Sequence, residues 1–232
     1  MPGYQVKHEQ IAISGAADLH IRSLLDRRQF SDPLDAAAHL GISSAAWPMF
    51  GLLWPSARHL AARMAAHPVR AGERILEIGC GLALASLVSH RRGADVTASD
   101  CHPMAAGFLD ENLRLNGLPA LPYRHARWQP DDAAGTAGCG SPGVQGRFDL
   151  IVGSDLLYER DDSASLAGFI DRHAKAHARV WIVDTNRGNR AAFGRQMTQR
   201  GFGLVQTRIE APATSGVAAY RGRLLSFRRV AQ

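Results

Sequence analysis

Two glycines and an acid stand close together in the most distinctive stretch of the chain, residues 74–86 (RILEIGCGLALAS). Glu77 lies in an apolar run. Gly79 and Gly81 then frame a turn, and a helix-like segment follows. A glycine turn between a strand and a helix lets the backbone approach a ligand closely, and the first N–H groups of the helix face that ligand. The stretch therefore predicts a site for a nucleotide-derived ligand.

The carboxylate of Glu77 helps to decide between ligands. The dinucleotide fingerprint needs a third glycine at position 84, which is a leucine. A carboxylate at the strand tip repels a pyrophosphate but attracts an ammonium or sulfonium group. S-adenosylmethionine carries both of these cations and no phosphate, so Glu77 favours it over a nicotinamide dinucleotide. The alternative is that Glu77 is a solvated turn residue.

Asp100 follows the next strand-like segment, 19 residues after Gly81. An acid at this place can accept hydrogen bonds from both ribose hydroxyls of an adenosine. Asp100 also precedes Pro103, so it can cap a helix instead, and the two roles can coexist. His102 lies beside Asp100 and is predicted to contact the adenosine.

The elements that must position these residues alternate along the chain at helical and strand-like periods. We expect helices at residues 55–67, 82–92, 103–116, 163–176 and 190–200. We expect strands at residues 75–78, 94–98, 121–126, 148–153, 180–183, 203–210 and 222–229. This alternation predicts an α/β fold with a doubly wound, mostly parallel sheet. No helical pattern separates the last two strands, so they are expected to pair antiparallel at one edge.

The first 49 residues are predicted to be an N-terminal extension that could act as a substrate lid, and residues 50–232 to form the main domain. Residues 4–13 alternate weakly, as in a short strand or hairpin, while residues 18–28 suit a surface segment. Residues 31–49 are rich in alanine and are broken by prolines and a glycine. The segment from Gln129 to Arg147 is expected to be a loop.

The glycine motif, Asp100 and the antiparallel tail together resemble the class I (seven-β-strand) S-adenosylmethionine-dependent methyltransferases, over roughly residues 50–230. The resemblance implies a Rossmann-like sheet with strand order 3-2-1-4-5-7-6. It implies that the chain binds S-adenosyl-L-methionine and releases S-adenosyl-L-homocysteine. The cofactor-binding residues that it implies are Trp54, Glu77, Gly79, Cys80, Gly81, Asp100, Cys101, His102, Trp128 and Ser154.

Asp155-Leu156-Leu157-Tyr158 follows the fourth strand of the main domain, where the transferred methyl group lies in this fold. The stretch is similar to the D-x-x-Y signature of a branch (family 16-like) that methylates lysines of specific proteins, and residues 50–56 (FGLLWPS) and Trp128 resemble that branch too. Arg127 departs from it, because an Asp or Asn usually precedes the tryptophan. Trp54 and Trp128 could instead be core aromatics.

Methyl transfer needs an uncharged nucleophile held in line with the methyl group. A lysine amine has a free pKa of about 10.4, so the site must remove its proton or select its neutral form. Asp155 could orient the amine and pass its proton to water, and Tyr158 could line the channel. The alternative is that Asp155 caps the following helix while Tyr158 packs in the sheet. Acids after Tyr158 could attract a basic peptide or simply begin a helix.

Charge and composition limit the classes of partner that we expect. The net charge is +6, but the basic residues are scattered and 25 of the 27 are arginines, so nucleic acid is not the expected partner. Three cysteines without a CxxC pair predict a reducing compartment, and we expect a cytoplasmic protein without a leader or membrane span. The spacing of His90, His102 and His125 predicts no metal. We expect Cys80 to be a small packing residue.

The sequence does not identify the methyl acceptor. A lysine side chain of a protein is the main hypothesis, and a protein arginine is an alternative. A small-molecule N-methyltransferase is a further alternative and would have a closed, apolar acceptor pocket. A module that binds the cofactor without transfer is another, and a nicotinamide-binding reductase would prefer NAD over S-adenosylmethionine.

Overall fold

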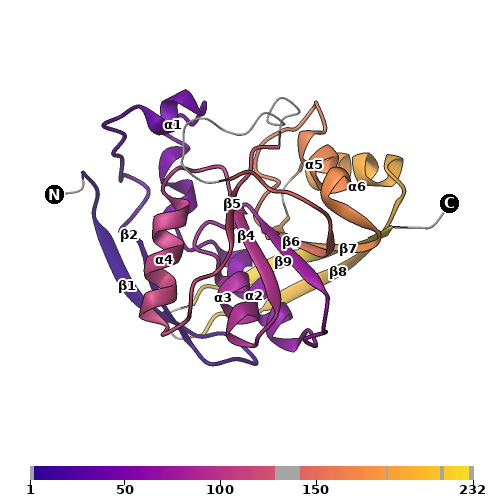
Figure 1. Cartoon of the computed structure of the whole chain (residues 1–232), viewed down its shortest axis with the longest axis horizontal. Coiled ribbons are helices and arrows are strands. Elements are labelled where there is room, and N and C mark those ends of the chain that lie inside the picture. Colours follow the sequence, from indigo (N-terminus) through magenta and orange to yellow (C-terminus); the bar gives the residue numbers. More distant parts are fainter. Residues whose placement is uncertain (1–2, 129–141, 187, 215–216, 230–232) are drawn as a thin grey trace.

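A computed structural model describes residues 3–128, 142–186, 188–214 and 217–229. Its main feature is a seven-stranded sheet of order β5-β4-β3-β6-β7-β9-β8 (Figure 1). The strands of this sheet are β3 (Arg74–Ile78), β4 (Asp95–Asp100), β5 (Tyr123–His125), β6 (Phe148–Ser154), β7 (Ala174–Thr185), β8 (Phe202–Ala211) and β9 (Tyr220–Arg229). Pairs from β5 to β7 are parallel, and β9 pairs antiparallel with both β7 and β8. The predicted fold class and strand order are confirmed.

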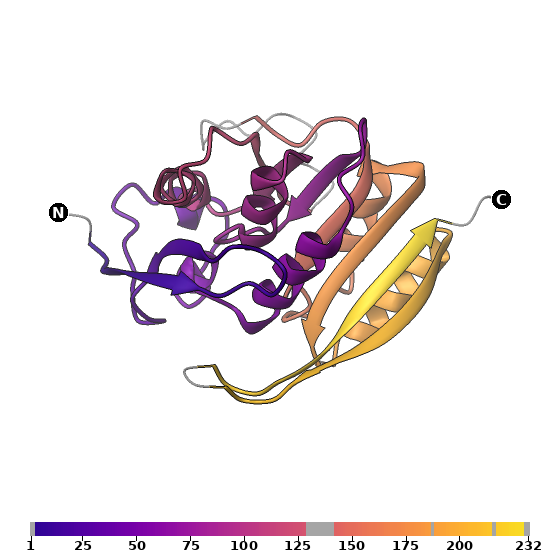
Figure 2. The ribbon, with the colours of Figure 1, turned by 90° about the horizontal axis from the view of Figure 1, so that it is seen from below.

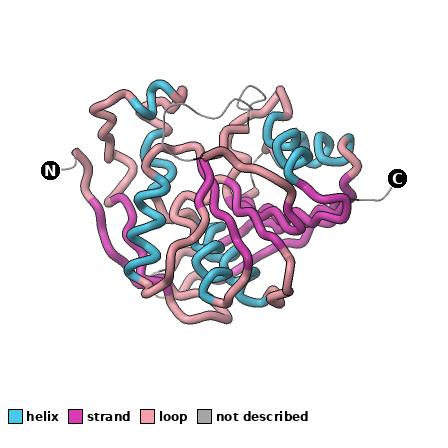
Figure 3. Tube along the Cα trace, in the orientation of Figure 1, coloured by secondary structure: helices cyan, strands magenta, loops and turns pink. Residues whose placement is uncertain are grey.

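Helices cover both faces of the sheet because its central strands are apolar on both sides. On one face lie α2 (Pro55–Ala66), α3 (Leu84–Arg91) and α4 (Ala105–Leu115), and their buried side chains share one core cluster. On the other face α5 (Ser165–His173) and α6 (Arg190–Gln199) form a second core cluster. Figure 3 shows loops, drawn in pink, along the upper edge, where α1 (Ala36–His39) also lies.

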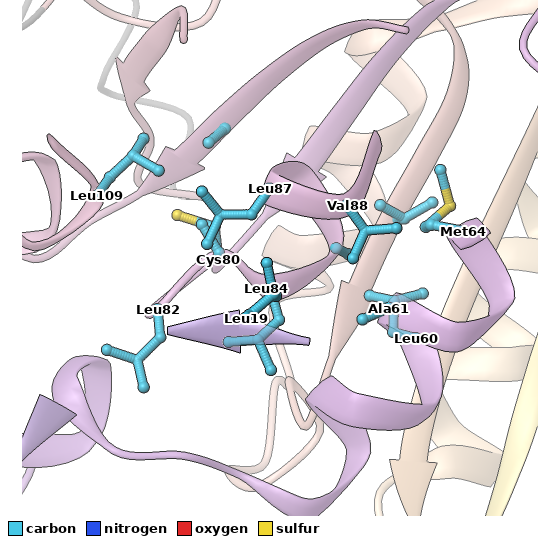
Figure 4. Close-up of a cluster of buried hydrophobic side chains, with 14 of the residues drawn as sticks. Leu19, Leu60, Ala61, Met64, Cys80, Leu82, Leu84, Leu87, Val88 and Leu109 are labelled. Carbon is cyan, nitrogen blue, oxygen red and sulfur yellow. The ribbon is translucent and has the colours of Figure 1, made fainter. Parts of the chain in front are cut away.

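The N-terminal residues form a hairpin that packs against α4 (Figures 1 and 2). Its strands are β1 (Val6–Ile11) and β2 (Leu19–Leu24). Asn112 of α4 accepts a hydrogen bond of 2.7 Å from the backbone N–H of Arg22, so a helix side chain satisfies an edge of the hairpin. Leu19 is buried in the same core as α2 and α3 (Figure 4). A domain boundary at residue 50 stays a prediction.

Two expected elements are wrong. Residues 18–28 were predicted as a surface segment, but they contain β2, in which Leu19, Ile21 and Ser23 alternate toward the core. The helix predicted at residues 163–176 ends at His173, because β7 already begins at Ala174. The two residues after Lys175 are exposed, so no apolar period marks the start of the strand. Among the described residues, no helix has the length and apolar character that crossing a bilayer requires.

Candidate active site

A cavity of about 1270 Å³ opens beyond the carboxyl ends of β3, β4 and β6, the edge at which ligands bind in such sheets. All the predicted site residues except Glu77 line it. These are Trp54, Gly79, Cys80, Gly81, Asp100, Cys101, His102, Trp128, Ser154, Asp155 and Tyr158. Residues more than 100 positions apart in the sequence therefore line one cavity.

The glycine turn needs both of its glycines. Gly79 and Gly81 have φ angles of +55° and +52°, in the left-handed region that side chains disfavour. A Cβ at Gly81 would lie 2.8 Å from the carbonyl oxygen of Phe50, so the turn also approaches another segment closely. The backbone N–H of Cys80 donates to the carbonyl of Ser99, which ties the turn to β4.

Glu77 lies beneath this turn rather than in the cavity wall. Its side chain is buried, and its Oε2 accepts hydrogen bonds from the backbone N–H (2.7 Å) and the hydroxyl of Ser86. Burial raises the pKa of Glu77 to about 7, although the Ser86 hydrogen bonds oppose this shift. The carboxyl group thus anchors the start of α3 and is not a solvated turn residue. Its action on a cationic ligand stays a prediction.

Asp100 joins the ends of β3 and β4. One carboxylate oxygen accepts the N–H of Gly81 at 2.8 Å, and the other accepts the N–H of His102 at 2.9 Å. Burial raises the pKa of Asp100, and these backbone N–H groups oppose the rise. Each carboxylate oxygen can accept a second hydrogen bond, so the turn contacts leave capacity for ribose hydroxyls.

His102 is held in an aromatic stack beside Asp100. Its ring lies 3.7 Å from that of Phe50, nearly parallel to it, and Trp47 meets it edge-on at 5.5 Å. Burial lowers the pKa of His102 to about 3, so the ring is neutral. Because its Nδ1 accepts the N–H of Met104, the proton is on Nε2, which is buried without a hydrogen-bond partner among the described residues.

The segment before α2 forms a wall of the cavity, and of this segment the sequence assigned only Trp54 to the site by residue. Its lining residues are Leu40, Gly41, Ile42, Ser43, Ala46, Met49, Phe50, Leu52 and Leu53. The irregular pattern of this segment gave no period to detect. Trp54 fixes its end, since the indole N–H donates to the carbonyl of Met49 at 2.8 Å. Trp128 packs against the core as well as lining the cavity, so its core and site interpretations are compatible.

Asp155 lines the same cavity as the glycine turn, directly after β6, which pairs with β3. It has a φ of +54°, and its N–H donates to Val183 of β7 at 2.9 Å. Its Oδ2 accepts the backbone N–H of Ser56 at 3.0 Å, so it caps the distant helix α2 rather than the following helix. Tyr158 is 51% exposed at the cavity rim and does not pack in the sheet. The alternative for this pair is therefore wrong.

The acids after Tyr158 have different surroundings. Asp161 accepts the N–H groups of Ser165 and Leu166, which makes it the cap of α5. Asp162 forms an exposed ion pair with Arg160 at 2.6 Å. The helix-start interpretation therefore holds for Asp161. Most of the predicted loop 129–147, and also Cys139, lie outside the described residues, while Cys80 and Cys101 are free thiols.

Solved methyltransferase structures match the fold of this chain. The T. thermophilus 16S rRNA N2 G1207 methyltransferase (RsmC), solved with AdoMet and guanosine, matches 99% of this chain and 52% of its own with a TM-score of 0.61 and 17% identity. The chain has the class I methyltransferase fold. Magnesium protoporphyrin IX methyltransferase (ChlM) from Synechocystis PCC 6803, solved with bound SAM, matches this methyltransferase fold over 75% of the chain and 78% of its own, with a TM-score of 0.56 and 15% identity.

Curated relatives agree with the methyltransferase fold, although no family model matches the chain. The electron transfer flavoprotein beta subunit lysine methyltransferase of Mus musculus is 29% identical over 143 residues, which are 60% of this chain and 51% of that protein. EEF1A lysine methyltransferase 3 of Mus musculus is 24% identical over 57% of this chain and 55% of its own. The chain thus spans about half the length of the curated relatives it matches. These relatives confirm the resemblance to the lysine-directed branch.

Proposed function

We propose that the chain is an S-adenosylmethionine-dependent methyltransferase that methylates the Nζ atom of a lysine in a specific protein. One observation carries the proposal: Asp155 and Tyr158 line the same cavity as the glycine turn and Asp100. The curated lysine methyltransferases that the chain resembles support the choice of acceptor.

The described residues fit the cofactor. The glycine turn admits a ligand close to its backbone, and Asp100 offers acceptor capacity for the ribose hydroxyls. The buried, unpartnered N–H of His102 needs an acceptor, which an adenosine ring nitrogen or ribose oxygen would supply. When bound, the cofactor supplies an electrophilic methyl group on a sulfonium.

Asp155 is the residue that would act on the acceptor amine. Its carboxylate is fixed by the N–H of Ser56, so it can accept a hydrogen bond from the amine with little loss of rotational freedom. The amine must be neutral to attack, and Asp155 would accept its proton and pass it to water. The exposed ring and hydroxyl of Tyr158 would guide the side chain from solvent.

The outer half of the cavity favours a protein acceptor over a compact metabolite. Exposed residues from Tyr158 to Arg160 line it, together with polar residues of the α6 region, Asn189 and Gln196. A closed, apolar pocket would favour a small molecule, whereas this half carries exposed polar residues and reaches solvent. A protein arginine stays open as an alternative acceptor. The free thiols support our further proposal that the protein works in the reducing cytoplasm.

Labelling of a cell lysate tests the proposal. Purified protein and S-adenosylmethionine with a tritiated methyl group are incubated with a lysate of the source cells, and the proteins are separated on a gel. We expect one or a few discrete labelled bands with the wild type and none with Asp155→Asn. Labelling confined to small metabolites would reject the protein acceptor. Binding of NAD in preference to S-adenosylmethionine in calorimetry would reject the cofactor.

A further inference from the structure

Arginine side chains gather around Trp181 of β7, on the sheet face that α2 covers. The guanidinium carbon of Arg63, on α2, lies 4.5 Å from the centroid of the indole ring, and that of Arg179 lies 5.4 Å from it. Trp181 is only 4% exposed, so these cations and α2 cover the ring. Two cations held over one aromatic ring form an ordered basic site rather than two independent surface charges.

One acid, Glu73, forms ion pairs with several of these basic side chains. Glu73 pairs with Arg179, with Arg70 at 3.5 Å and with the Nε2 of His67 at 2.7 Å. Among the described residues, no other acid forms an ion pair with Arg63, Arg70 or Arg179. Because Glu73 is shared between these partners, the surroundings of Trp181 carry an excess of positive charge.

Arg228 of β9 adds a further cation, placed opposite another arginine. It lies directly opposite Arg179 in the β7–β9 register, and directly opposed residues of an antiparallel pair share a face of the sheet. Its neighbour on the other side is Gly203 of β8, which has no side chain to compensate the charge. Like charges placed opposite each other destabilise a sheet, and an anion bound between them would remove that cost.

The sheet is open beside these arginines. Helix α2 packs on β6 and β7, whereas α6 packs against β8 on the opposite face (Figure 2). Val205 of β8 pairs with Ser226, which pairs with Trp181, so all three lie on the α2 side. The Val205 side chain is 67% exposed. An apolar centre with a charged rim is the usual composition of a protein-binding surface.

We propose that this surface, formed by Arg63, Arg179, Val205 and Arg228 and called here the Trp181 face, docks an acidic patch of another protein. The compact cluster with an exposed valine and an embedded carboxylate favours a folded protein surface, because nucleic acid needs a track of cations along its phosphates. The site is separate from the cavity: six residues of β7, about 20 Å at 3.3 Å per residue, separate Arg179 from the carboxyl end of the strand. The inference does not rest on the proposed function.

Charge-removing variants test the docking. Fluorescence anisotropy is used to measure binding of a labelled poly-L-glutamate peptide to the full chain at low salt. Arg63→Gln combined with Arg228→Gln should weaken binding by about tenfold. Arg221→Gln is the matched control, because Arg221 is an exposed residue of β9 that lies on the opposite face, paired with Glu210. It should change the affinity by less than about twofold.

Two controls separate docking from folding and from the candidate active site. Thermal melting of the double variant should stay close to that of the wild type, because the lost Arg63–Trp181 contact and the relieved Arg179–Arg228 repulsion oppose each other. The S-adenosylmethionine affinity should not change. Equal polyglutamate affinity in all variants would overturn the proposal. Tighter binding of the wild type to a single-stranded RNA of equal charge, lost in the double variant, would also overturn it by making the partner a nucleic acid.

Discussion

Asp155→Asn separates the two tasks that the structure gives this side chain. Asp155 caps α2 through the N–H of Ser56 at 3.0 Å, and it faces the cavity in which we propose methyl transfer. Asparagine has the same shape and keeps an oxygen that can accept the Ser56 N–H. It loses the negative charge that would orient the amine and accept its proton.

The magnitudes follow from burial and from the type of hydrogen bond. A hydrogen bond to a charged group contributes about 1.5–3 kcal/mol, roughly twice a neutral one, so Asp155→Asn should lower the free energy of unfolding by about 1 kcal/mol. For a chain of this size, that corresponds to a fall of about 2–4 °C in the melting temperature. Asp155→Ala leaves a buried N–H unsatisfied and should cost about 1–3 kcal/mol. Loss of the proton acceptor should slow transfer by about 10²–10⁴-fold in both variants.

Single-turnover methyl transfer and urea unfolding measure the two effects separately. Asp149→Asn is the matched control, because Asp149 lies near the other end of β6 and accepts the backbone N–H of Arg74 at 2.9 Å. This control should lose similar stability and keep its transfer rate. A folded Asp155→Asn protein with wild-type transfer would refute the role of Asp155. Equal slowing by Asp149→Asn would show that reduced stability alone explains the loss.

Three more predictions concern the cofactor half of the cavity. Gly81→Ala should abolish S-adenosylmethionine binding in calorimetry, because φ at Gly81 is +52° and the added Cβ would meet the Phe50 carbonyl. Gly93→Ala is the control: Gly93 also has a positive φ but faces open space, so this variant should bind S-adenosylmethionine normally. The affinity for S-adenosylmethionine should rise as the pH rises through about 7, because ionised Glu77 attracts the cationic ligand. Glu77→Gln should abolish that rise. A wild-type affinity that does not depend on pH would contradict this role of Glu77. His102→Phe keeps the aromatic stack but removes the Nε2–H, so calorimetry should show an S-adenosylmethionine affinity about tenfold lower. The Met104 N–H also loses its acceptor, so the variant should melt slightly earlier; unchanged affinity would refute the contact.

The sequence was most informative where one local pattern decides one structure. The strand, glycine turn and helix around Glu77 follow from adjacent residues, because glycine adopts the left-handed conformation of Gly79 and Gly81 without the strain that a side chain adds. The acid at the end of β4 followed from spacing alone. These features placed the cavity correctly, since parallel strands bring their carboxyl ends to one edge.

Contacts between distant residues could not be predicted in this way. The hydrogen bond between Asp155 and Ser56 joins residues 99 positions apart, and a single sequence carries no signal for it. Glu77 was expected at a ligand, and no local pattern predicted that Ser86, in the first turn of α3, donates a hydrogen bond to its carboxylate. The cavity wall before α2 is irregular and has no period, so only tertiary packing reveals it.

Mass spectrometry of the labelled acceptor directly tests whether the chain transfers a methyl group to a protein lysine. S-adenosylmethionine with a ¹³C-labelled methyl group is incubated with the protein and a lysate, and labelled peptides are sequenced. We expect the heavy methyl group on the Nζ atom of lysine in a specific protein, and its loss with Asp155→Asn. A heavy methyl group found on arginine, or only on small metabolites, would contradict it.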